Sequence, residues 1–362
     1  MKKKYLLIVQ GEGRGHMTQA ISMQDLLIEN GHEVCGVIIG ACENRDIPQF
    51  FLDKIKAPVT RLPSPNFVTD KKNKSINIPK SVLHNFGKLG VFKQSLRTID
   101  KIIQEQKPDM VINFFDLLTG LYYRFYKPTI PLLCIAHQYI YFHPDFEFPK
   151  GFAMDRMAIK LYTKLTAYGS SKNLALSFYD IAQKDQNVTV VPPLLRDDVF
   201  TLSPTTGSHY LVYLVNHGYF EEIVQWHKNH PDVELHCFTD KPSFIEQNFS
   251  YDKTKLFVHA LNDKLFLEKM STAKGLATTA GFESVCEAMF LGKPVLMVPV
   301  QGHFEQFCNS RDAYKANAGI YADNFNLSSL VNYTSQYNYN NPGFKEWIAN
   351  AKERIYEEIV SC

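Results

Sequence analysis

The sequence has little that would place the protein across a membrane, in an oxidising compartment or on nucleic acid. No apolar run reaches 18 residues, so no segment is long enough for a transmembrane helix. The seven cysteines form no Cys-x-x-Cys pair and lie mostly in apolar runs, as reduced thiols do, and we therefore expect a cytoplasmic protein. The net charge is only +2, which argues against a general nucleic-acid binder.

The glycine-rich turn near the N-terminus does not match a dinucleotide-binding motif. Residues 5–10 form an apolar strand that leads into Gly-Glu-Gly-Arg-Gly-His at residues 11–16, and a helix and a second strand follow. The dinucleotide motif requires a third glycine where His16 stands. It also requires an acidic residue after the second strand, where residues 40–42 are Gly-Ala-Cys. The sequence therefore argues against a nicotinamide cofactor.

The sequence also lacks the usual signs of a metal site. It has no Asp-x-Asp pair of the kind that holds a metal-bound diphosphate. The nearest cluster among the twelve histidines is His227, His230 and His236, and Pro231 interrupts its spacing. We expect no metal and no cofactor. A bound diphosphate would then be held by helix N-termini, backbone and side chains.

Strand and helix patterns alternate along two stretches, residues 5–190 and 209–321, which predicts two parallel, doubly wound sheets. The segment between them contains two adjacent prolines and then a Ser/Thr/Gly-rich run, which is typical of a linker. We expect an N-terminal domain at residues 1–198, a linker at 199–208, a second domain at 209–340 and a C-terminal helix at 341–362.

The segment at residues 275–306 combines features that suit a phosphorylated ligand. A short apolar strand ends at Gly281, and the helix predicted at residues 282–291 follows, with Gly292 and a proline as its stop. Glu283 and Glu287 are four residues apart and share one face of this helix near its N-terminus. The free N–H groups and the helix dipole at that end favour an anionic group.

This segment resembles the C-terminal motif of nucleotide-sugar glycosyltransferases with the GT-B fold, of the branch related to the peptidoglycan GlcNAc transferase. In that family a glutamate five residues before the glycine of a Gly-x-Pro stop holds the ribose hydroxyls, and Glu287 stands there. An acidic-Gln pair six and seven residues after the next proline contacts the donor sugar, and Glu305 and Gln306 stand there. The resemblance implies an α/β protein with two Rossmann-like domains, each a doubly wound parallel sheet, that face each other across a cleft.

The resemblance implies further donor contacts, many of them at glycine turns and at the ends of strands. They are Gly13 and Gly15 in the first glycine turn, Asn216 and Gly218 after the first strand of the second half, Ala260 and Leu261 beside the nucleobase, and Thr279, Ala280, Gly281, Phe282 and Glu283 around the helix N-terminus. For Asn216 and Gly218 a plain turn between strand and helix is the alternative.

The N-terminal half supplies candidates for the catalytic base and the acceptor contacts. His16 is the candidate base by residue type, because the pKa of an imidazole suits the removal of a hydroxyl proton; a phosphate or sugar contact and a capping role are its alternatives. Asp116, which ends the strand predicted at residues 109–115, is its partner or substitute, and Glu12 is a further candidate. His137 and Gln138 follow the next strand and are expected to contact the acceptor, with a plain hydrogen-bonding role as the alternative.

The resemblance predicts an enzyme that transfers a hexosyl or N-acetylhexosaminyl group from a nucleotide sugar, most simply a UDP-sugar, to a hydroxyl group with inversion. The acceptor is a sugar, a lipid-linked molecule or a small molecule, and neither a monomer nor a dimer is favoured. Two alternatives remain open: a nucleotide-sugar epimerase or hydrolase of the same fold, and a nucleotide-sugar-binding protein without catalysis.

A basic amphipathic stretch begins at Lys71 and ends at Arg97. It carries seven basic residues and no acidic ones, interleaved with apolar residues, a pattern that suits anionic lipid. The resembled family often uses membrane-bound acceptors, so we expect peripheral contact with the inner face of a membrane and a role in cell-envelope glycan synthesis. The alternative is a basic loop followed by an ordinary helix packed on its sheet.

Overall fold

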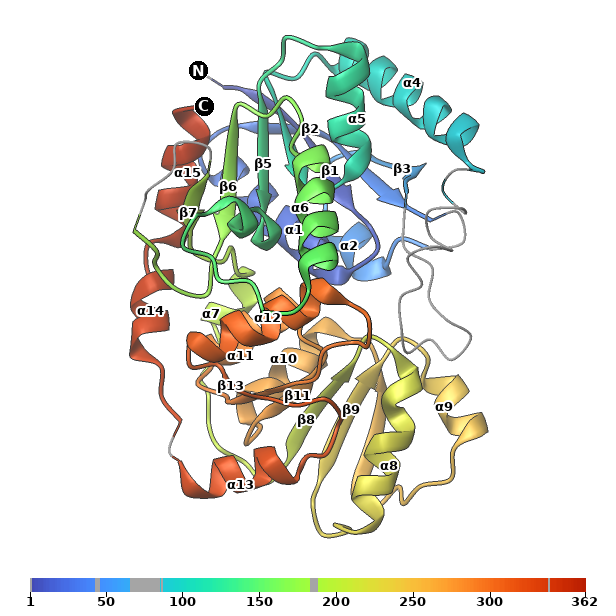
Figure 1. Ribbon diagram of the computed structural model, residues 1–362, viewed down its shortest axis with the longest axis vertical. Coiled ribbons are helices and arrows are strands. Elements are labelled where there is room, and N and C mark those ends of the chain that lie inside the picture. The colour runs from blue at the N-terminus through green and yellow to red at the C-terminus, as the bar shows by residue number, and fades with distance from the viewer. Residues whose placement is uncertain (1, 43–45, 66–84, 86, 183–187, 338) are drawn as a thin grey trace. The chain divides into compact units, whose positions relative to one another are not determined.

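The structure is a computed structural model that describes residues 2–42, 46–65, 85, 87–182, 188–337 and 339–362 (Figure 1). Contacts along the chain divide it into two compact units. Unit 1 holds the described residues up to Arg196 together with Trp347–Cys362, and unit 2 holds Asp197–Glu346.

Unit 1 is built on a parallel sheet of seven strands in the order β3-β2-β1-β4-β5-β6-β7. The strands are β1 (Lys4–Gln10), β2 (Glu33–Ala41), β3 (Val59–Pro63), β4 (Met110–Phe114), β5 (Leu132–Ala136), β6 (Lys172–Leu176) and β7 (Thr189–Val191). The central strands are mostly apolar, and all their residues are buried except the two ends of β1, which is typical of a parallel sheet covered on both faces.

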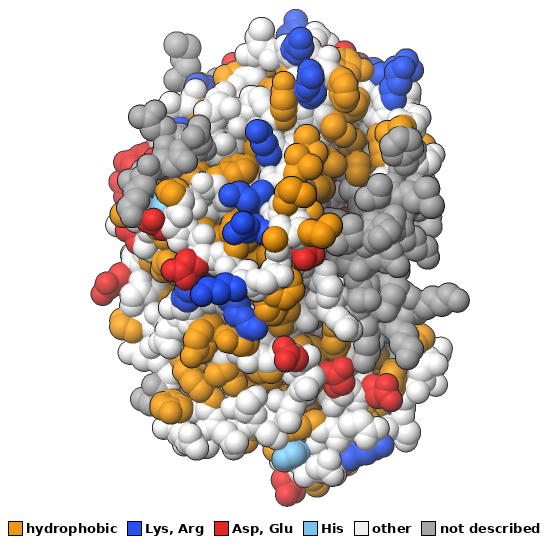
Figure 2. Space-filling view, viewed as in Figure 1, with side chains coloured by type: hydrophobic (Ala, Val, Ile, Leu, Met, Phe, Trp, Pro, Cys, Tyr) orange, Lys and Arg blue, Asp and Glu red, His pale blue; other side chains and the backbone are white. Residues whose placement is uncertain are grey.

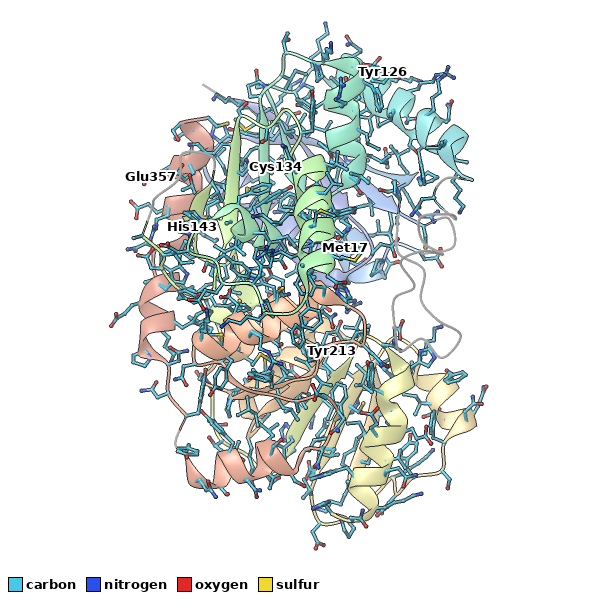
Figure 3. The ribbon with its side chains drawn as sticks, viewed as in Figure 1. Met17, Tyr126, Cys134, His143, Tyr213 and Glu357 are labelled. Atoms are coloured by element: carbon cyan, nitrogen blue, oxygen red, sulfur yellow. The ribbon has the colours of Figure 1, made fainter. Side chains whose placement is uncertain are left out.

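Helices cover both faces of this sheet. They are α1 (Arg14–Glu29), α2 (Gln49–Lys54), α4 (Leu89–Gln106), α5 (Leu117–Tyr126), the short 3-10 helix η1 (His137–Phe142), α6 (Ala153–Thr166) and α15 (Ala351–Val360). Helices α4, α5 and α6 pack side by side on one face, and α1 contacts α15 on the other (Figure 1). Met17 of α1 and Cys134 of β5 lie in the core between these layers (Figure 3).

Unit 2 is built on a parallel sheet of six strands in the order β10-β9-β8-β11-β12-β13. The strands are β8 (Tyr210–Leu214), β9 (Leu235–Thr239), β10 (Leu256–Ala260), β11 (Leu276–Thr278), β12 (Val295–Met297) and β13 (Gly319–Tyr321). Its helices are α7 (Asp197–Phe200), the 3-10 helix η2 (His217–Tyr219), α8 (Phe220–Lys228), α9 (Pro242–Asn248), α10 (Asp263–Thr272), α11 (Phe282–Phe290), α12 (Phe304–Lys315) and α13 (Ser328–Gln336). The two doubly wound parallel sheets confirm the predicted α/β fold class.

Two predicted elements differ from those observed. The single C-terminal helix expected within residues 341–362 is two helices, α14 (Pro342–Ile348) and α15, because the backbone leaves the helical conformation at Asn350, where φ is −113°. The strand expected at residues 109–115 ends at Phe114, because Phe115 takes a left-handed conformation with φ of 61°. Trp347 packs in unit 1, where its Nε1 donates a hydrogen bond to the carbonyl of Ser177 over 2.9 Å.

Candidate functional site

Each sheet has a topological switch point, where the chain crosses from one half of the sheet to the other. In unit 2 it lies between the neighbouring strands β8 and β11, and in unit 1 it lies between β1 and β4. Ligands of open parallel sheets bind beyond the carboxyl ends of the strands at such points. Most of the predicted site residues follow these four strands or the strands beside them.

Helix α11 begins at the switch point of unit 2, and its N-cap residue has no side chain that could cap it. Gly281 is the N-cap residue, and a Cβ placed on it would meet only one atom within 4 Å, the carbonyl oxygen of Thr279 at 3.9 Å. The backbone N–H groups and the dipole of a helix N-terminus suit an anion such as a diphosphate. Glu283 and Glu287 are both buried on α11, one turn apart.

Three buried oxygen atoms near this helix start have no hydrogen-bond partner within the part of the chain that the structure describes. They are Oγ1 of Thr278, Oγ1 of Thr279 and Oδ1 of Asn309. An unpaired buried polar atom costs about 1–3 kcal/mol, and native proteins keep few of them without a reason. A polar ligand that bonds to these atoms when it binds would supply that reason. The sequence pointed to Thr279; Asn309 was missed, although its position three residues after Gln306 places both on one face of α12.

Helix α12 is tied to the loop before α11, and Gln306 shapes the loop that precedes α12. Nδ2 of Asn309 donates to the carbonyl of Ala280 over 3.2 Å. Oε1 of Gln306 accepts a hydrogen bond from the backbone N–H of Val300 over 2.9 Å, so its Nε2 is the group that can donate to a ligand. Glu305 lies beside it in the first turn of α12.

The loops after β8 and β12 are joined to each other. The hydroxyl of Tyr219 accepts a hydrogen bond from the backbone N–H of Gln301 over 3.1 Å. Oδ1 of Asn216 accepts one from the N–H of Gly218 over 3.0 Å, which fixes the turn that opens η2. At the end of β10, Ala260 is exposed. The structure therefore brings the loops after β8, β11 and β12 together at one edge of the sheet.

In the glycine turn of unit 1, Gly11 is closely packed and Gly13 has open space beside it. A Cβ on Gly11 would lie 2.8 Å from Cγ2 of Ile39, whereas one on Gly13, the N-cap residue of α1, would meet nothing within 4 Å. Oε1 of Glu12 accepts a hydrogen bond from the N–H of Cys42 over 2.8 Å. The start of α1 is thus a second N-terminus that suits an anion.

His16 lies in the first turn of α1 and not in the loop before it, because the helix starts at Arg14. Its side chain is half-buried, and its Nδ1 is 3.1 Å from Oε1 of Gln19. An amide oxygen only accepts hydrogen bonds, so Nδ1 carries the proton in this arrangement. Nε2 then holds the lone pair that a general base needs.

Asp116 is a buried capping residue in this structure, and none of its hydrogen bonds within the described chain goes to His16. The carboxylate accepts from the N–H of Leu118 over 2.8 Å and from the hydroxyl of Ser64 over 3.1 Å. Burial raises the pKa of Asp116 from 3.8 to about 7, against the lowering effect of these hydrogen bonds. A Cβ on Gly40 would collide with the Asp116 carboxylate, so glycine at position 40 makes room for this carboxyl group.

Phe115 is a residue that the sequence did not single out. Its φ of 61° is unusual for a bulky side chain, and such strain concentrates at functional sites. Its ring centroid lies 5.9 Å from that of His16 and 5.6 Å from those of Tyr139 and Tyr162. Phe115 therefore forms an aromatic wall beside the candidate base, and nothing in the sequence pattern indicates a left-handed residue here.

His137 and Gln138, the two residues expected to contact the acceptor, are more buried than a surface site would need. Nδ1 of His137 donates to the carbonyl of Leu176 over 2.7 Å, and burial lowers the pKa of His137 to about 4. Gln138 is also buried. A neutral His137 anchored in this way positions η1, and its role toward an acceptor stays a prediction.

The histidines that are closest in sequence do not come together. Nε2 of His227 bonds to the carbonyl of Val233 and Nδ1 of His230 to the carbonyl of Trp226, while His236 lies in β9 beside His209 and Glu234. Of the basic stretch that begins at Lys71, residues 71–84 and 86 lie outside the described residues. Its later part forms the start of α4, which buries Phe92 and Leu96 and leaves Leu89 exposed.

Comparison with known proteins gives a family and a fold. The sequence matches the family model for glycosyl transferase family 1 over residues 3–337. Comparison with curated protein sequences gives no significant match.

Solved structures of similar fold are glycosyltransferases. Phytolacca americana UGT2 complexed with UDP-2fluoro-glucose and pterostilbene has a TM-score of 0.63 at 12% identity, with 99% of each chain covered. The calicheamicin glycosyltransferase CalG4 has a TM-score of 0.59 at 14% identity, with 100% of this chain and 98% of that chain covered. MurG from Acinetobacter baumannii has a TM-score of 0.57 at 14% identity, with 100% of each chain covered.

Proposed function

The chain belongs to glycosyl transferase family 1 and has the GT-B fold, and from this premise we propose that it transfers a hexosyl or N-acetylhexosaminyl group from a UDP-sugar to an acceptor hydroxyl. The acceptor oxygen forms the new bond to the anomeric carbon with inversion, while the bond from that carbon to the diphosphate breaks and UDP leaves with the electron pair. The observation that carries the proposal is the group of unpaired buried oxygens, on Thr278, Thr279 and Asn309, near the start of α11.

The donor is proposed to bind at the switch point of unit 2. The N-terminus of α11, starting from Gly281, stabilises the diphosphate and the charge that develops on it as the glycosidic bond breaks. Glu287 accepts hydrogen bonds from the ribose hydroxyls, and Gln306, with Glu305, contacts the sugar. The joined loops after β8 and β12 support this placement, because they are held in position before the donor arrives.

The acceptor and its base are proposed to belong to unit 1. His16 removes the proton of the acceptor hydroxyl through Nε2, while Gln19 holds its other ring nitrogen. The buried, capping position of Asp116 supports His16 as the base and assigns Asp116 to the support of α5. Burial raises the pKa of Asp116 to about 7, so near neutral pH its carboxyl group keeps a proton for much of the time.

We propose that transfer needs no divalent metal at the diphosphate. The sequence has no Asp-x-Asp pair, and the N-terminus of α11 supplies positive potential in its place. Transfer at an unchanged rate in EDTA would support this assignment. Loss of transfer that manganese or magnesium restores would overturn it.

The proposed reaction is tested with an array of sugar, lipid-linked and small-molecule acceptors and several UDP-sugars, read by mass spectrometry, with the anomeric configuration of the product read by NMR. We expect a glycosylated acceptor with inverted configuration. Free sugar or an epimerised donor formed without acceptor would instead identify a hydrolase or an epimerase. UDP binding without any reaction would identify a binding protein.

We also propose that unit 1 rests on an anionic membrane through helix α6. The helix buries Thr163 and Thr166 and turns large apolar side chains outward. Met154, Met157, Leu161 and Leu165 are 79%, 68%, 57% and 39% exposed. This spacing places them along one side of the helix.

Basic side chains accompany this apolar surface. Arg156, Lys160 and Lys164 are exposed on α6, and Tyr126 is exposed at the end of the neighbouring α5 (Figure 3). Figure 2 shows hydrophobic side chains next to Lys and Arg on this face of the molecule. Apolar side chains that insert shallowly and cations that meet anionic headgroups are the features of an interfacial helix. No helix among the described residues has the length and apolarity to span a bilayer.

A further inference from the structure

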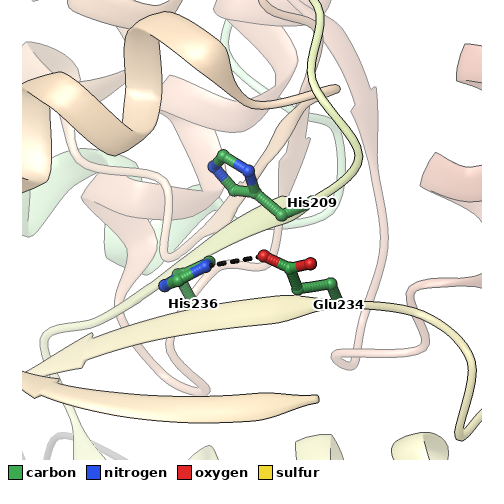
Figure 4. Close-up of side chains that lie close together, drawn as sticks. All are labelled: His209, Glu234 and His236. Atoms are coloured by element: carbon green, nitrogen blue, oxygen red, sulfur yellow. Dashed lines mark hydrogen bonds and ion pairs between the residues drawn. The ribbon is translucent and has the colours of Figure 1, made fainter. Parts of the chain in front are cut away.

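A cluster of polar side chains lies at the amino ends of β8 and β9, the edge of the unit 2 sheet opposite to the proposed donor loops. His209 directly precedes β8, Glu234 directly precedes β9, and His236 is the second residue of β9. The two strands are parallel neighbours with Tyr210 paired to Leu235, so the three side chains meet at one edge (Figure 4).

The potential ligand atoms of these three residues are close together and largely shielded from water. One ring nitrogen of each histidine and one carboxylate oxygen of Glu234 all lie within 4.8 Å of one another. Nε2 of His236 and Oε1 of Glu234 are already 3.0 Å apart. The exposed fraction is 6% for His209 and 5% for His236. Two imidazoles and a carboxylate form a ligand set that suits zinc.

The outer hydrogen bonds of the two histidines are compatible with a lone pair on each ring that faces the cluster. Nε2 of His209 is 3.0 Å from the carbonyl of Lys269, which can only accept, so Nδ1 of His209 keeps the lone pair. Nδ1 of His236 is 2.8 Å from Nε2 of His259. In this structure Nε2 of His236 donates to the Glu234 carboxylate over 3.0 Å. In the other tautomer the proton is on Nδ1, which donates to His259, and the lone pair of Nε2 is then available to a metal ion. Metal-binding histidines typically donate their other ring N–H to a neighbouring acceptor in this way.

A cation already stands at this point of the structure. Nζ of Lys269 is 3.3 Å from Nε2 of His236. Lys269 is only half-buried, so its long side chain can leave without unpacking the core. A divalent ion in its place would bind all three ligands directly. An ammonium group suits this arrangement less well, because its N–H bonds point in different directions.

We propose that His209, Glu234 and His236 bind one zinc ion that fixes the amino edge of the unit 2 sheet. In a tetrahedral zinc site the ligand atoms are about 3.3 Å apart, so the pair at 3.0 Å already fits. The other ligand atoms need to close from at most 4.8 Å. Through the Lys269 carbonyl and His259, the ion would also support α10 and β10. The site is structural and is independent of the proposed glycosyl transfer.

The test measures zinc binding to the full chain after removal of metals with a chelator. We expect saturable binding of one zinc ion, a higher temperature of unfolding with zinc, and an X-ray absorption spectrum with nitrogen and oxygen ligands only. Glu234→Gln should weaken zinc binding by at least about 10–100-fold, and so should His259→Phe, which removes only an outer partner. Lys269→Met should strengthen it, because the competing ammonium group is gone.

A matched control variant distinguishes zinc binding at this site from binding at other histidines. The Lys269 variant distinguishes a metal site from a plain polar cluster. His230→Gln should leave zinc affinity unchanged, because His230 bonds to the backbone outside the cluster. Sulfur in the absorption spectrum, or zinc affinity unchanged by both Glu234→Gln and Lys269→Met, would overturn the proposal. Both of these side chains are partly exposed, so the test does not depend on a variant of a buried histidine.

Discussion

Nδ2 of Asn309 donates a hydrogen bond to the carbonyl of Ala280 over 3.2 Å, and this bond ties helix α12 to the loop from which α11 starts. The amide oxygen of the same side chain stays unpaired within the described chain, as does the hydroxyl of Thr279 in that loop. The loop is thus fixed in position while some of its polar atoms are unsatisfied. That combination is expected of a binding site that is preorganised for a polar ligand.

Thr279→Val should separate ligand binding from stability. The change replaces a hydroxyl by a methyl group of similar size and removes a buried polar atom that has no partner. We expect the temperature of unfolding to stay level or to rise, while UDP affinity falls by about tenfold, the value of one hydrogen bond of about 1.4 kcal/mol. Thermal unfolding and calorimetry measure the two effects.

Thr119→Val is the matched control for this change. The hydroxyl of Thr119 is equally buried but donates to Oδ1 of Asn113 over 3.0 Å. Its loss should destabilise the protein by about 1–3 kcal/mol and leave UDP affinity unchanged. A Thr279→Val variant that is destabilised like this control, with unchanged UDP affinity, would show that Thr279 has only a structural role.

Asp116 should make the protein less stable as the pH rises toward neutrality. Burial raises the pKa of this carboxyl group from 3.8 to about 7, so between these values the folded chain holds a proton that the unfolded chain has lost. The free energy of unfolding contributed by the group therefore falls from about pH 4 to about pH 7 and is level above that. Asp116→Asn, which cannot ionise, should gain stability relative to the wild type over this window. If the unfolding temperatures of the two proteins changed in the same way from pH 5 to pH 8, the raised pKa of Asp116 would be contradicted.

His16→Ala should lower turnover by about 10²–10⁴-fold, the usual contribution of a general base, with a much smaller effect on donor affinity. Asp116→Asn should cost less, because Asp116 caps α5 and makes no hydrogen bond to His16. Single-turnover kinetics at saturating donor distinguish chemistry from binding. Unchanged single-turnover chemistry with a strongly raised donor Kd would make His16 a phosphate contact and leave Glu12 or Asp116 as the base.

Helix α6 should bring the protein to phosphatidylglycerol vesicles in a salt-dependent way. Each basic residue near such a surface contributes about 1 kcal/mol. Lys160→Glu combined with Met157→Ser should reduce cosedimentation, whereas Lys264→Glu, at an exposed lysine of α10 in unit 2, should have little effect. Absence of binding at low salt would contradict the proposal. Self-association that the α6 double variant abolishes would show that a second copy of the chain covers this surface.

The sequence was sufficient for the fold because each buried strand is a compact apolar run followed by a turn signal. The runs at residues 5–10 and before Gly281 therefore predicted β1 and β11, and alternation with helices implied parallel sheets. The helix N-terminus at Gly281 was predictable for the same local reason. The resemblance supplied Glu287, Glu305 and Gln306.

The rest depended on contacts between distant segments. The left-handed conformation of Phe115 has no local signal, since the residue is neither glycine nor asparagine. The capping role of Asp116 depends on Ser64 and on the space left by Gly40, both far away in the chain. His209, Glu234 and His236 meet only because β8 and β9 are neighbours, and sequence spacing pointed instead to His227 and His230.

The central claim, that the switch point of unit 2 binds a nucleotide-sugar donor, is tested most directly by calorimetric titration of UDP into the wild type and Glu287→Ala. Charge-assisted hydrogen bonds to the ribose are worth about 1.5–3 kcal/mol, so the variant should bind UDP about 10- to 100-fold more weakly, while Glu353→Ala, at an exposed glutamate of α15, should bind it normally. A folded Glu287→Ala variant with wild-type affinity, or a wild type that does not bind UDP, would contradict the account.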